Sequence, residues 1–372
     1  MLAKVAHLTQ WIEERAPQRL AEDWDNPGLM WGHPQNDVRH VLLAVDGTDA
    51  VLEEAVRKGA GLVVLHHPSL WKDVKQLRTD QALGRRVELC LRHGVAVYAA
   101  HTNYDAAADG VSDSLARRLG LNDVQVLDVT ARDRLQKLVV FVPRGHEDDV
   151  RQALAAAGAG WIGKYSHCSF QVDGTGTFLP REGADPFIGA VGKLERVDEV
   201  RLETVVTASI SRRVVAAMLR AHPYEEVAYD LIPLDNEAPA FGAGRVGSLA
   251  YALPLEELAR LVKEACRVPA LRLVGDLNRP VTRVAVCGGD GGDLLQAASH
   301  AGADVLVTGD LDHHQALEAL DLGLMVVDAG HFGTEWPGMA DLSEWLNSRL
   351  EAGGYQTRCE LAESGRDPFQ FV

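Results

Sequence analysis

Hydrophobic and polar positions follow two different periods along the N-terminal part of the chain. The runs at 38–47, 61–67 and 95–105 are dense in Val, Leu and Ala, which is typical of buried strands. The segments at 49–60 and 82–94 repeat their apolar residues at helical spacing. Strands that alternate with helices of this length indicate β-α-β units and a parallel sheet.

The same alternation returns toward the C-terminus. Strands are predicted at 281–292, 304–314 and 324–332, and helices at 293–303 and 315–323. In both parts a helix and a glycine lead into an apolar strand that ends in histidine. We interpret the chain as an α/β fold with two related lobes, each with a parallel-type sheet. The alternative is that all short β-α-β units share this pattern.

The middle of the chain has another order of elements. Its predicted strands and helices follow the order β-α-β-β-α-β, the ferredoxin-like α+β arrangement, at 135–143, 146–158, 166–172, 200–208, 211–222 and 227–234. An irregular stretch at 173–189 separates the middle strands. We therefore predict a domain at 130–235, inserted into a core made of 1–128 and 240–372, with 233–244 as its exit linker.

Composition narrows the class of protein. The net charge of −16 over 372 residues argues against general nucleic-acid binding, because attraction to phosphates needs a basic surface. No apolar run approaches the roughly 20 residues that span a bilayer, and the charged N-terminal helix is unlike a signal peptide. The five cysteines are scattered without a C-x-x-C pair, which indicates reduced thiols. We expect a cytoplasmic protein.

Polar side chains gather where the predicted strands end. Ligands of open parallel sheets bind beyond the carboxyl ends of the strands, so these positions are the place to look for a site. They hold imidazoles and carboxylates: His66, His67, His101, Asn103, Asp105, Asp310, His313, His314, His331 and Glu335, with Asp46 and Asp290 just past two further strands. Neutral nitrogen ligands combined with anionic oxygen suit a divalent transition metal.

Each of these motifs alone has a simpler explanation. The pair in "HHP" is compatible with a capping or core role, and "HTNYD" with an Asx-turn. His331 and Glu335 are four residues apart, so they share a face if the segment is helical, but a loop entering the helix at 339–350 fits as well. The glycines of 287–293 suit a phosphate near a helix N-terminus or merely a tight turn.

Taken together, the motifs resemble a known family. The stretches "WDNPGLMWG" (24–32), "HHP" (66–68), "AAHTNYDAAADGVSD" (99–113), "TGDLDHHQALEALDLGL" (308–324) and "DAGHFGTE" (328–335) resemble those of the GTP cyclohydrolase 1 type 2 homologue family. The resemblance covers 1–128 and 240–372 and implies a dinuclear-metal protein that forms toroidal homo-hexamers. The middle segment, with "AHPYEEVAYD", resembles the PII/CutA-like insert of longer members.

The resemblance also implies the site. The metal ligands of the family fall on His66, His67, Asp105, His331 and Glu335. Glu335 is expected to bridge two divalent ions (Zn, Fe or Mn), with His67 and Asp105 on one ion and His66 and His331 on the other. His101 and His314 are expected to support the ligands or contact the substrate. His313 departs from the motifs of the family, and the sequence gives it no role.

The expected activity is metal-dependent hydrolysis of a nucleotide or of a phosphorylated small molecule. The family name implies opening of the guanine ring of GTP, and phosphoester hydrolysis suits the same pair of ions at least as well. The alternative is a non-enzymatic metal-binding scaffold or regulator, in which the PII-like insert senses a ligand.

Overall fold

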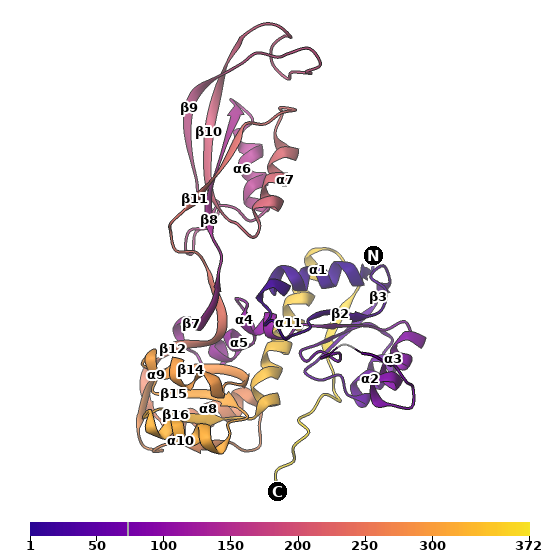
Figure 1. Ribbon diagram of the computed structural model, residues 1–372, viewed down its shortest axis with the longest axis vertical. Helices are drawn as coiled ribbons and strands as arrows, with labels where there is room; N and C mark the ends of the chain where they lie inside the picture. Colours follow the sequence, from indigo (N-terminus) through magenta and orange to yellow (C-terminus); the bar gives the residue numbers. More distant parts are fainter. Residues whose placement is uncertain (73) are drawn as a thin grey trace. The chain divides into compact units, whose positions relative to one another are not determined.

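The computed structural model describes residues 1–72 and 74–372. They form two compact units, one of residues 1–131 with 241–372 and one of residues 132–240. The first unit contains two α/β lobes, and each lobe has its own sheet (Figure 1). No described helix is both long and apolar enough to cross a membrane.

The first lobe is built on a five-stranded sheet with the order β17-β4-β5-β6-β2. The strands are β17 (Arg358–Leu361), β4 (His40–Ala44), β5 (Ala60–Leu65), β6 (Ala96–Ala99) and β2 (Gly28–Trp31). The first four run parallel, whereas β2 pairs with β6 in the antiparallel sense. A separate two-stranded sheet joins β1 (Ala3–Lys4) to β3 (Asp37–Val38).

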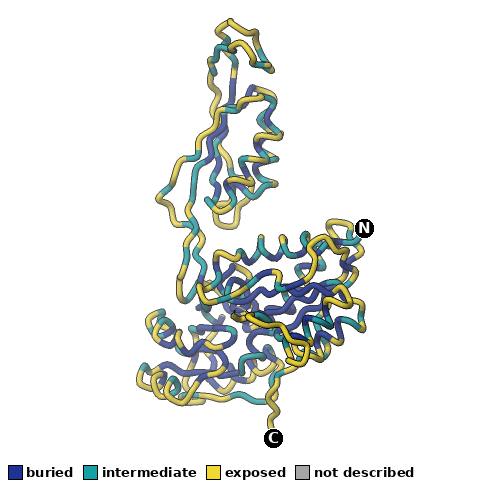
Figure 2. Tube along the Cα trace, turned by 45° about the vertical axis from the view of Figure 1, so that its right-hand side comes forward, coloured by how far each residue is buried: buried dark blue, intermediate teal, exposed yellow. Residues whose placement is uncertain are grey.

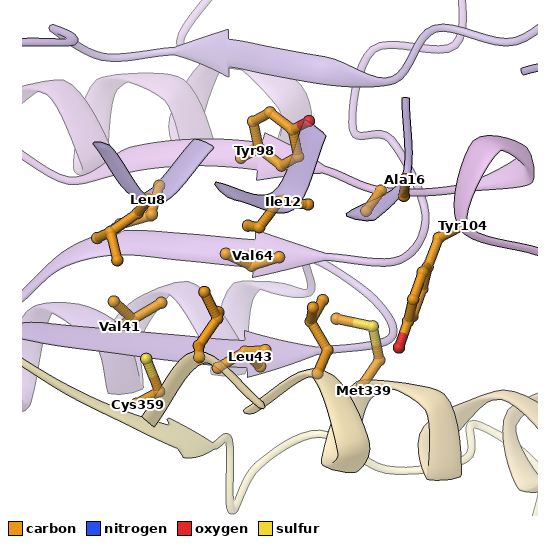
Figure 3. Packing of buried hydrophobic residues seen from close by; sticks show 14 of the residues in the cluster. Leu8, Ile12, Ala16, Val41, Leu43, Val64, Tyr98, Tyr104, Met339 and Cys359 are labelled. Carbon is orange, nitrogen blue, oxygen red and sulfur yellow. The ribbon is translucent and has the colours of Figure 1, made fainter. Parts of the chain in front are cut away.

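Helices cover both faces of this sheet. Because successive side chains of a strand point to opposite faces, Val41 and Leu43 pack on one side and Leu42 and Ala44 on the other. The first side meets α1 (Val5–Arg15) and α11 (His331–Ala352), as Figure 3 shows, and the second meets α2 (Asp49–Arg57) and α3 (Ala82–Arg92). Burial on both faces explains why these strands read as nearly unbroken apolar runs.

The second lobe has a six-stranded sheet with the order β13-β16-β15-β14-β12-β7. The strands are β13 (Arg272–Val274), β16 (Met325–Asp328), β15 (Val305–Gly309), β14 (Pro280–Asp290), β12 (Ala240–Pro254) and β7 (Asn122–Arg132). Strands β14, β15 and β16 are parallel to one another, whereas β13 and β12 pair with this group in the antiparallel sense. The predicted lobes are confirmed as α/β, but their sheets are mixed, because β2 in the first lobe and β12 and β13 in the second are antiparallel to their neighbours.

The remaining helices complete the first unit. In the second lobe, α5 (Val111–Arg118) and α8 (Leu255–Cys266) pack on one face of the sheet, and α9 (Leu295–His300) and α10 (His313–Asp321) on the other. The short helices are η1 (Gln18–Leu20), α4 (Thr102–Ala106) and η2 (Gly292–Leu294). Figure 2 shows the resulting concentration of buried positions in the central strands of both lobes.

The unit of residues 132–240 has the predicted order of elements. These are β8 (Leu135–Pro143), α6 (Glu147–Ala156), β9 (Ser169–Phe178), β10 (Glu195–Thr207), α7 (Ser211–Ala221) and β11 (Tyr229–Leu234). The strands form an antiparallel sheet in the order β11-β8-β10-β9, and its core includes Val140, Leu154 and Met218. Part of the predicted irregular stretch is strand, because β9 continues to Phe178. Likewise β11 and β12 extend into the predicted linker from either side.

Candidate metal centre

The two adjacent histidines stand directly beyond the end of β5. The amide of His66 donates to the carbonyl of Ala44 at 3.1 Å, and the amide of His67 donates to Val45 at 2.9 Å. The backbone therefore stays tied to β4. The His66 side chain is fully buried, that of His67 is 17% exposed, and their ring centres are 5.1 Å apart.

The other predicted ligands come from two helices. Asp105 lies on α4, directly after β6, and its Oδ1 is 3.5 Å from Nε2 of His66. His331 is the first residue of α11, and Glu335 follows one turn later on the same face. The helical alternative for this segment is therefore correct. Gly330 turns the chain into the helix with a φ of 74°, a conformation that favours glycine.

Glu335 lies at the centre of the cluster. Its Oε1 is 3.4 Å from Nε2 of His66 and 3.0 Å from Nε2 of His331. Its Oε2 is 3.3 Å from Nε2 of His67. The Nε2 atoms of His67 and His331 are 3.2 Å apart. The structure thus brings all five predicted ligands together at the boundary of the two lobes.

Oxygen atoms behind the cluster fix the orientation of each imidazole. The Nδ1 atom of each histidine faces an acceptor oxygen, from His66 to the Ala100 carbonyl at 2.8 Å, from His67 to Asp46 at 2.8 Å and from His331 to Asp310 at 2.9 Å. A carbonyl or carboxylate only accepts, so each Nδ1 carries the proton and each neutral ring keeps the Nε2 lone pair for the cluster. This is the usual support of metal-bound histidine.

Asp310 holds its side chain in an uncommon backbone conformation. Its φ is 54°, in the left-handed region, immediately after the last residue of β15. Such a conformation is unfavourable for a residue other than glycine and is concentrated at functional sites. Here it accompanies the contact between Asp310 and His331.

Three buried polar atoms of the cluster have no partner with hydrogen-bond geometry, and their contacts with one another and with His67 are 3.3–3.5 Å long. They are Nε2 of His66, Oδ1 of Asp105 and Oε2 of Glu335, within the part of the chain that the structure describes. An unsatisfied buried polar atom is unfavourable, and a carboxylate oxygen in that state especially so. Divalent cations would satisfy all three atoms, and a set of three imidazoles and two carboxylates is a suitable donor set. The residues therefore fit the expected metal.

The charges of the cluster depend on one another. Burial acts against ionisation of Glu335, but the three imidazoles hold the pKa of its carboxyl well below the usual value. Burial likewise lowers the pKa of His67 and of His331, but the neighbouring carboxylates outweigh it and raise these pKa values to about 10 and about 9. Burial and the nearby Glu335 raise the pKa of Asp105, although His66 acts to lower it. Without a cation, protons on the imidazoles balance the negative charge.

His101 adds a further imidazole to the cluster. Its ring centre is 5.2 Å from that of His66 and 5.4 Å from that of His67. Nδ1 of His101 donates to Oδ1 of Asp25 at 2.8 Å. Burial acts to raise the pKa of Asp25, but this hydrogen bond and the one from the Thr102 hydroxyl lower it to about 2. His101 is therefore an oriented ring beside the predicted ligands.

His314 does not join this group. It lies in the first turn of α10, exposed, with its ring 5.6 Å from that of His313. The turn is capped by Asp312, whose carboxylate accepts from the amide of Gln315 at 2.8 Å. The predicted contact of His314 with ligands or substrate has no support in the described residues, and "GDLDHH" acts here as a polar helix cap.

Two contributors were not predicted. The first is Asp25, which orients His101; it lies in the "WDNPG" motif, which had served only to indicate the family. Gly289, within the glycine-rich stretch, has a φ of 67°, and a Cβ there would lie 2.5 Å from Oε1 of Glu335. Glycine is thus required for the close approach of this backbone to the cluster. The neighbouring Asp290 accepts from the amide of Gly292 at 3.0 Å, so the stretch forms a tight turn.

Comparison with known proteins decides the family. The model of the Duf34/NIF3 (NGG1p interacting factor 3) family matches residues 3–368. The chain belongs to this family. A Halalkalibacterium halodurans protein named GTP cyclohydrolase 1 type 2 homolog is 45% identical over 363 residues, which are 98% of this chain and 97% of that protein. The Bacillus subtilis protein of the same name is 44% identical over 365 residues, 98% of each chain.

A solved structure extends the comparison to the fold. The Bacillus cereus protein related to NIF3 superposes on this Duf34/NIF3 chain with a TM-score of 0.90 at 43% identity, and the match covers 100% of both chains. The resemblance drawn from the five motifs is therefore confirmed. It spans the second unit of the chain as well as the two lobes that carry those motifs.

Proposed function

We propose that this Duf34/NIF3 protein holds two divalent cations at the cluster and hydrolyses a nucleotide or another phosphorylated small molecule there. The observation that carries the proposal is the group of unsatisfied buried atoms on His66, Asp105 and Glu335. A protein core seldom leaves such atoms without partners, and here three of them converge from separate segments of the chain.

The donor distances favour a particular division of the ligands. His66 lies within 3.5 Å of Asp105, and His67 lies 3.2 Å from His331. Glu335 contacts histidines of both pairs through its two oxygens. In this division His66 and Asp105 would hold one ion, His67 and His331 would hold the other, and Glu335 would contribute to both. Compared with the division expected from the sequence, His66 and His67 exchange places, and the set of ligands is the same.

Two divalent cations in this place would supply Lewis acidity and promote the ionisation of water. Around them the chain positions groups for proton transfer. His101 donates through Nδ1 to Asp25, which leaves its Nε2 free to accept a proton. The Asp25 carboxylate would then stabilise the imidazolium, as the carboxylate of a catalytic triad does. His101 is the residue that we propose as general acid and base.

The chemistry of the ligands restricts the metal more than the substrate. Imidazole and carboxylate together suit Zn, Fe or Mn. The relatives are named as homologues of a GTP cyclohydrolase, so GTP is one candidate substrate. Phosphoesters are the other candidates, because a pair of cations also stabilises the charge of phosphoryl transfer.

The test is a substrate screen with matched variants. Protein loaded with Zn, Fe(II) or Mn would be assayed against GTP, other nucleotides and simple phosphoesters. We expect turnover of at least one compound, with a loss of at least about 100-fold in Glu335→Gln. Glu54→Gln removes another buried carboxylate, on α2, and should keep the activity. Equal turnover by wild type and Glu335→Gln would contradict the proposed mechanism.

A second candidate function is supported by a cavity within residues 132–240. It has a volume of about 700 Å³ and is lined by aromatic side chains that include Phe141, Phe178 and Phe187. Its polar lining includes the buried Glu199, which accepts from the hydroxyl of Tyr224 at 3.0 Å. A mainly apolar pocket with few polar groups is typical of small-molecule sites. This cavity favours a regulator in which a PII-like unit senses a ligand.

The same compounds discriminate the two functions. If the protein is a regulator, no compound is turned over, and binding of a compound to the cavity is weakened by Tyr224→Ala while the metal content is unchanged. We further propose, from the resemblance, a homo-hexamer in the cytoplasm. Light scattering tests the assembly, with an expected mass six times that of one chain.

A further inference from the structure

Two tryptophans beside the candidate metal centre are largely exposed. Trp24 is 61% exposed and Trp71 is 46% exposed. Their rings stack with a centroid distance of 6.2 Å and an interplanar angle of 15°. Large aromatic side chains normally bury much of their area, so an exposed, mutually stacked pair is an unusual use of tryptophan.

The pair borders the imidazoles of the cluster. The ring of Trp71 lies 5.0 Å from that of His101, nearly perpendicular at 86°, and 6.1 Å from that of His67. The ring of Trp24 lies 5.8 Å from that of His101. A molecule that contacts the exposed part of either indole is therefore next to a proposed metal ligand and to the proposed general base.

Hydrogen bonds hold the two tryptophan-bearing loops together. Nδ2 of Asn26 donates to the carbonyl of Leu70 at 2.6 Å, which joins the segment after Trp24 to the segment before Trp71. Asp25 accepts from His101 and also from the amide of Thr102 at 3.1 Å. The two loops that carry the indoles are thus tied to each other and to His101 before any ligand arrives, and a pre-organised surface of this kind loses less entropy on binding.

We propose that Trp24 and Trp71 form a stacking surface for a planar heteroaromatic ring of the substrate, whose reacting group lies at the cations. The proposal rests on the proposed function and narrows it. Aromatic side chains stack on the π-faces of nucleobases with little dependence on which base is present. Of the two substrate classes left open, the surface favours nucleotides over phosphorylated molecules that have no aromatic ring.

Calorimetry with matched ligands tests this surface. Guanosine 5′-monophosphate, adenosine 5′-monophosphate and ribose 5-phosphate would be titrated into metal-loaded wild type, Trp71→Ala, Trp24→Ala and Trp161→Ala. Trp161 is the matched control, since it is 58% exposed and belongs to the other unit. We expect both nucleotides to bind wild type at least about tenfold more tightly than ribose 5-phosphate.

The variants give the decisive comparison. Trp71→Ala and Trp24→Ala should abolish the preference for the ring while the affinity for ribose 5-phosphate stays within about twofold. Trp161→Ala should change neither value. Trp71→Phe keeps a smaller ring and should restore part of the preference, which also covers the case that Trp71→Ala does not fold. Equal affinities for the three ligands in wild type would overturn the proposal, as would an unchanged preference in both alanine variants.

Two further readouts separate this proposal from the one on which it rests. Elemental analysis of each protein reports whether two ions are bound. If wild type holds no metal, the proposed function fails, and titration with guanosine against ribose still decides whether the indoles bind a ring. Light scattering reports the assembly, and a change of mass in Trp71→Ala would assign the indoles to a contact between subunits and overturn the proposal.

Discussion

The Nε2 atoms of His67 and His331 lie 3.2 Å apart although 264 residues separate them in the chain. Each ring donates its Nδ1 proton to an aspartate, Asp46 or Asp310. The two Nε2 lone pairs would therefore repel each other unless a proton or a cation lies between them. Competition between protons and metal for these nitrogens follows directly from the geometry.

Metal binding at neutral pH is expected to release protons. The pKa of His67 is raised to about 10 and that of His331 to about 9, so without metal this pair of rings holds at least one extra proton at pH 7. A metal ligand must be neutral imidazole, so about one or two protons leave per chain. Calorimetry in buffers of different ionisation enthalpy measures this number. It should fall toward zero as the pH rises through 9 to 10, and a heat independent of buffer at pH 7 would contradict it.

The aspartates behind the histidines are expected to control metal affinity. Asp46→Asn and Asp310→Asn keep the shape of the side chain but remove the charge that holds and polarises His67 or His331. Each change should weaken binding of one ion by about 10- to 100-fold, because supporting partners of ligands typically have effects of this size. Competition with a chromogenic chelator measures the affinity.

A nearby aspartate serves as the control for this pair of variants. Asp49 is 52% exposed and pairs with Arg86, so Asp49→Asn should leave both ions bound as in wild type. If Asp46→Asn and Asp310→Asn bind metal as tightly as Asp49→Asn does, the two aspartates do not support the ligands.

Glu54 is expected to stabilise the fold without affecting the metal. Its carboxylate, 2% exposed, accepts from the amides of Glu363 and Ser364 at 3.0 and 2.8 Å and pairs with Lys58 at 3.0 Å. Burial opposes ionisation, but these bonds lower its pKa from 4.5 to about 2. Glu54→Gln should therefore lower the free energy of unfolding by about 1–3 kcal/mol at pH 7.

The sign of the pH dependence follows from the lowered pKa. A carboxyl with a lower pKa in the folded state stabilises it above the unfolded pKa of about 4.5 and loses that contribution as the pH falls toward 2. Urea unfolding should show a gap between wild type and Glu54→Gln that narrows below pH 4.5. Glu363→Gln, 84% exposed, should differ from wild type by less than about 0.5 kcal/mol. A gap that widens on acidification would contradict this role of Glu54.

The first unit is expected to fold without residues 132–240. Gly242 approaches the backbone of Asp128 so closely that a Cβ would lie 1.9 Å from its carbonyl oxygen, and β7 and β12 are neighbours in one sheet. A short turn joining 131 to 241 thus replaces the removed unit without strain, as insertions with adjacent ends allow. Circular dichroism and elemental analysis should show a folded protein that binds two ions. Insolubility of every such deletion would indicate a shared core.

Much of the first unit could be predicted from the sequence, because strands that are buried on both faces consist of nearly continuous apolar residues. β5 and β15 were placed within a few residues, and their polar exits led to His66, His67 and Asp310. The edge strands β2 and β13 were not predicted, since such short segments carry little periodic signal.

The details of the site depended on contacts that no local pattern encodes. Asp25 is 76 residues from His101 in the chain, and only the fold brings the two together. The proposed division of ligands rests on distances of 3.5 Å between His66 and Asp105 and 3.2 Å between His67 and His331, which no local pattern of the sequence gives. The role of His314 stays a prediction, because the polar residues of a helix cap resemble those of a site and the sequence does not distinguish the two.

Metal stoichiometry of Glu335→Gln tests the central claim most directly. Glutamine keeps the size of the side chain but loses the negative charge that allows one carboxylate to hold two cations against their repulsion. Elemental analysis after purification without chelator should give two ions per chain for wild type and for Glu54→Gln, and at most one for Glu335→Gln. Asp105→Asn should have a smaller effect, because in the proposed division Asp105 would serve one ion. Two ions per chain in Glu335→Gln, with an unchanged circular dichroism spectrum, would contradict the bridging role.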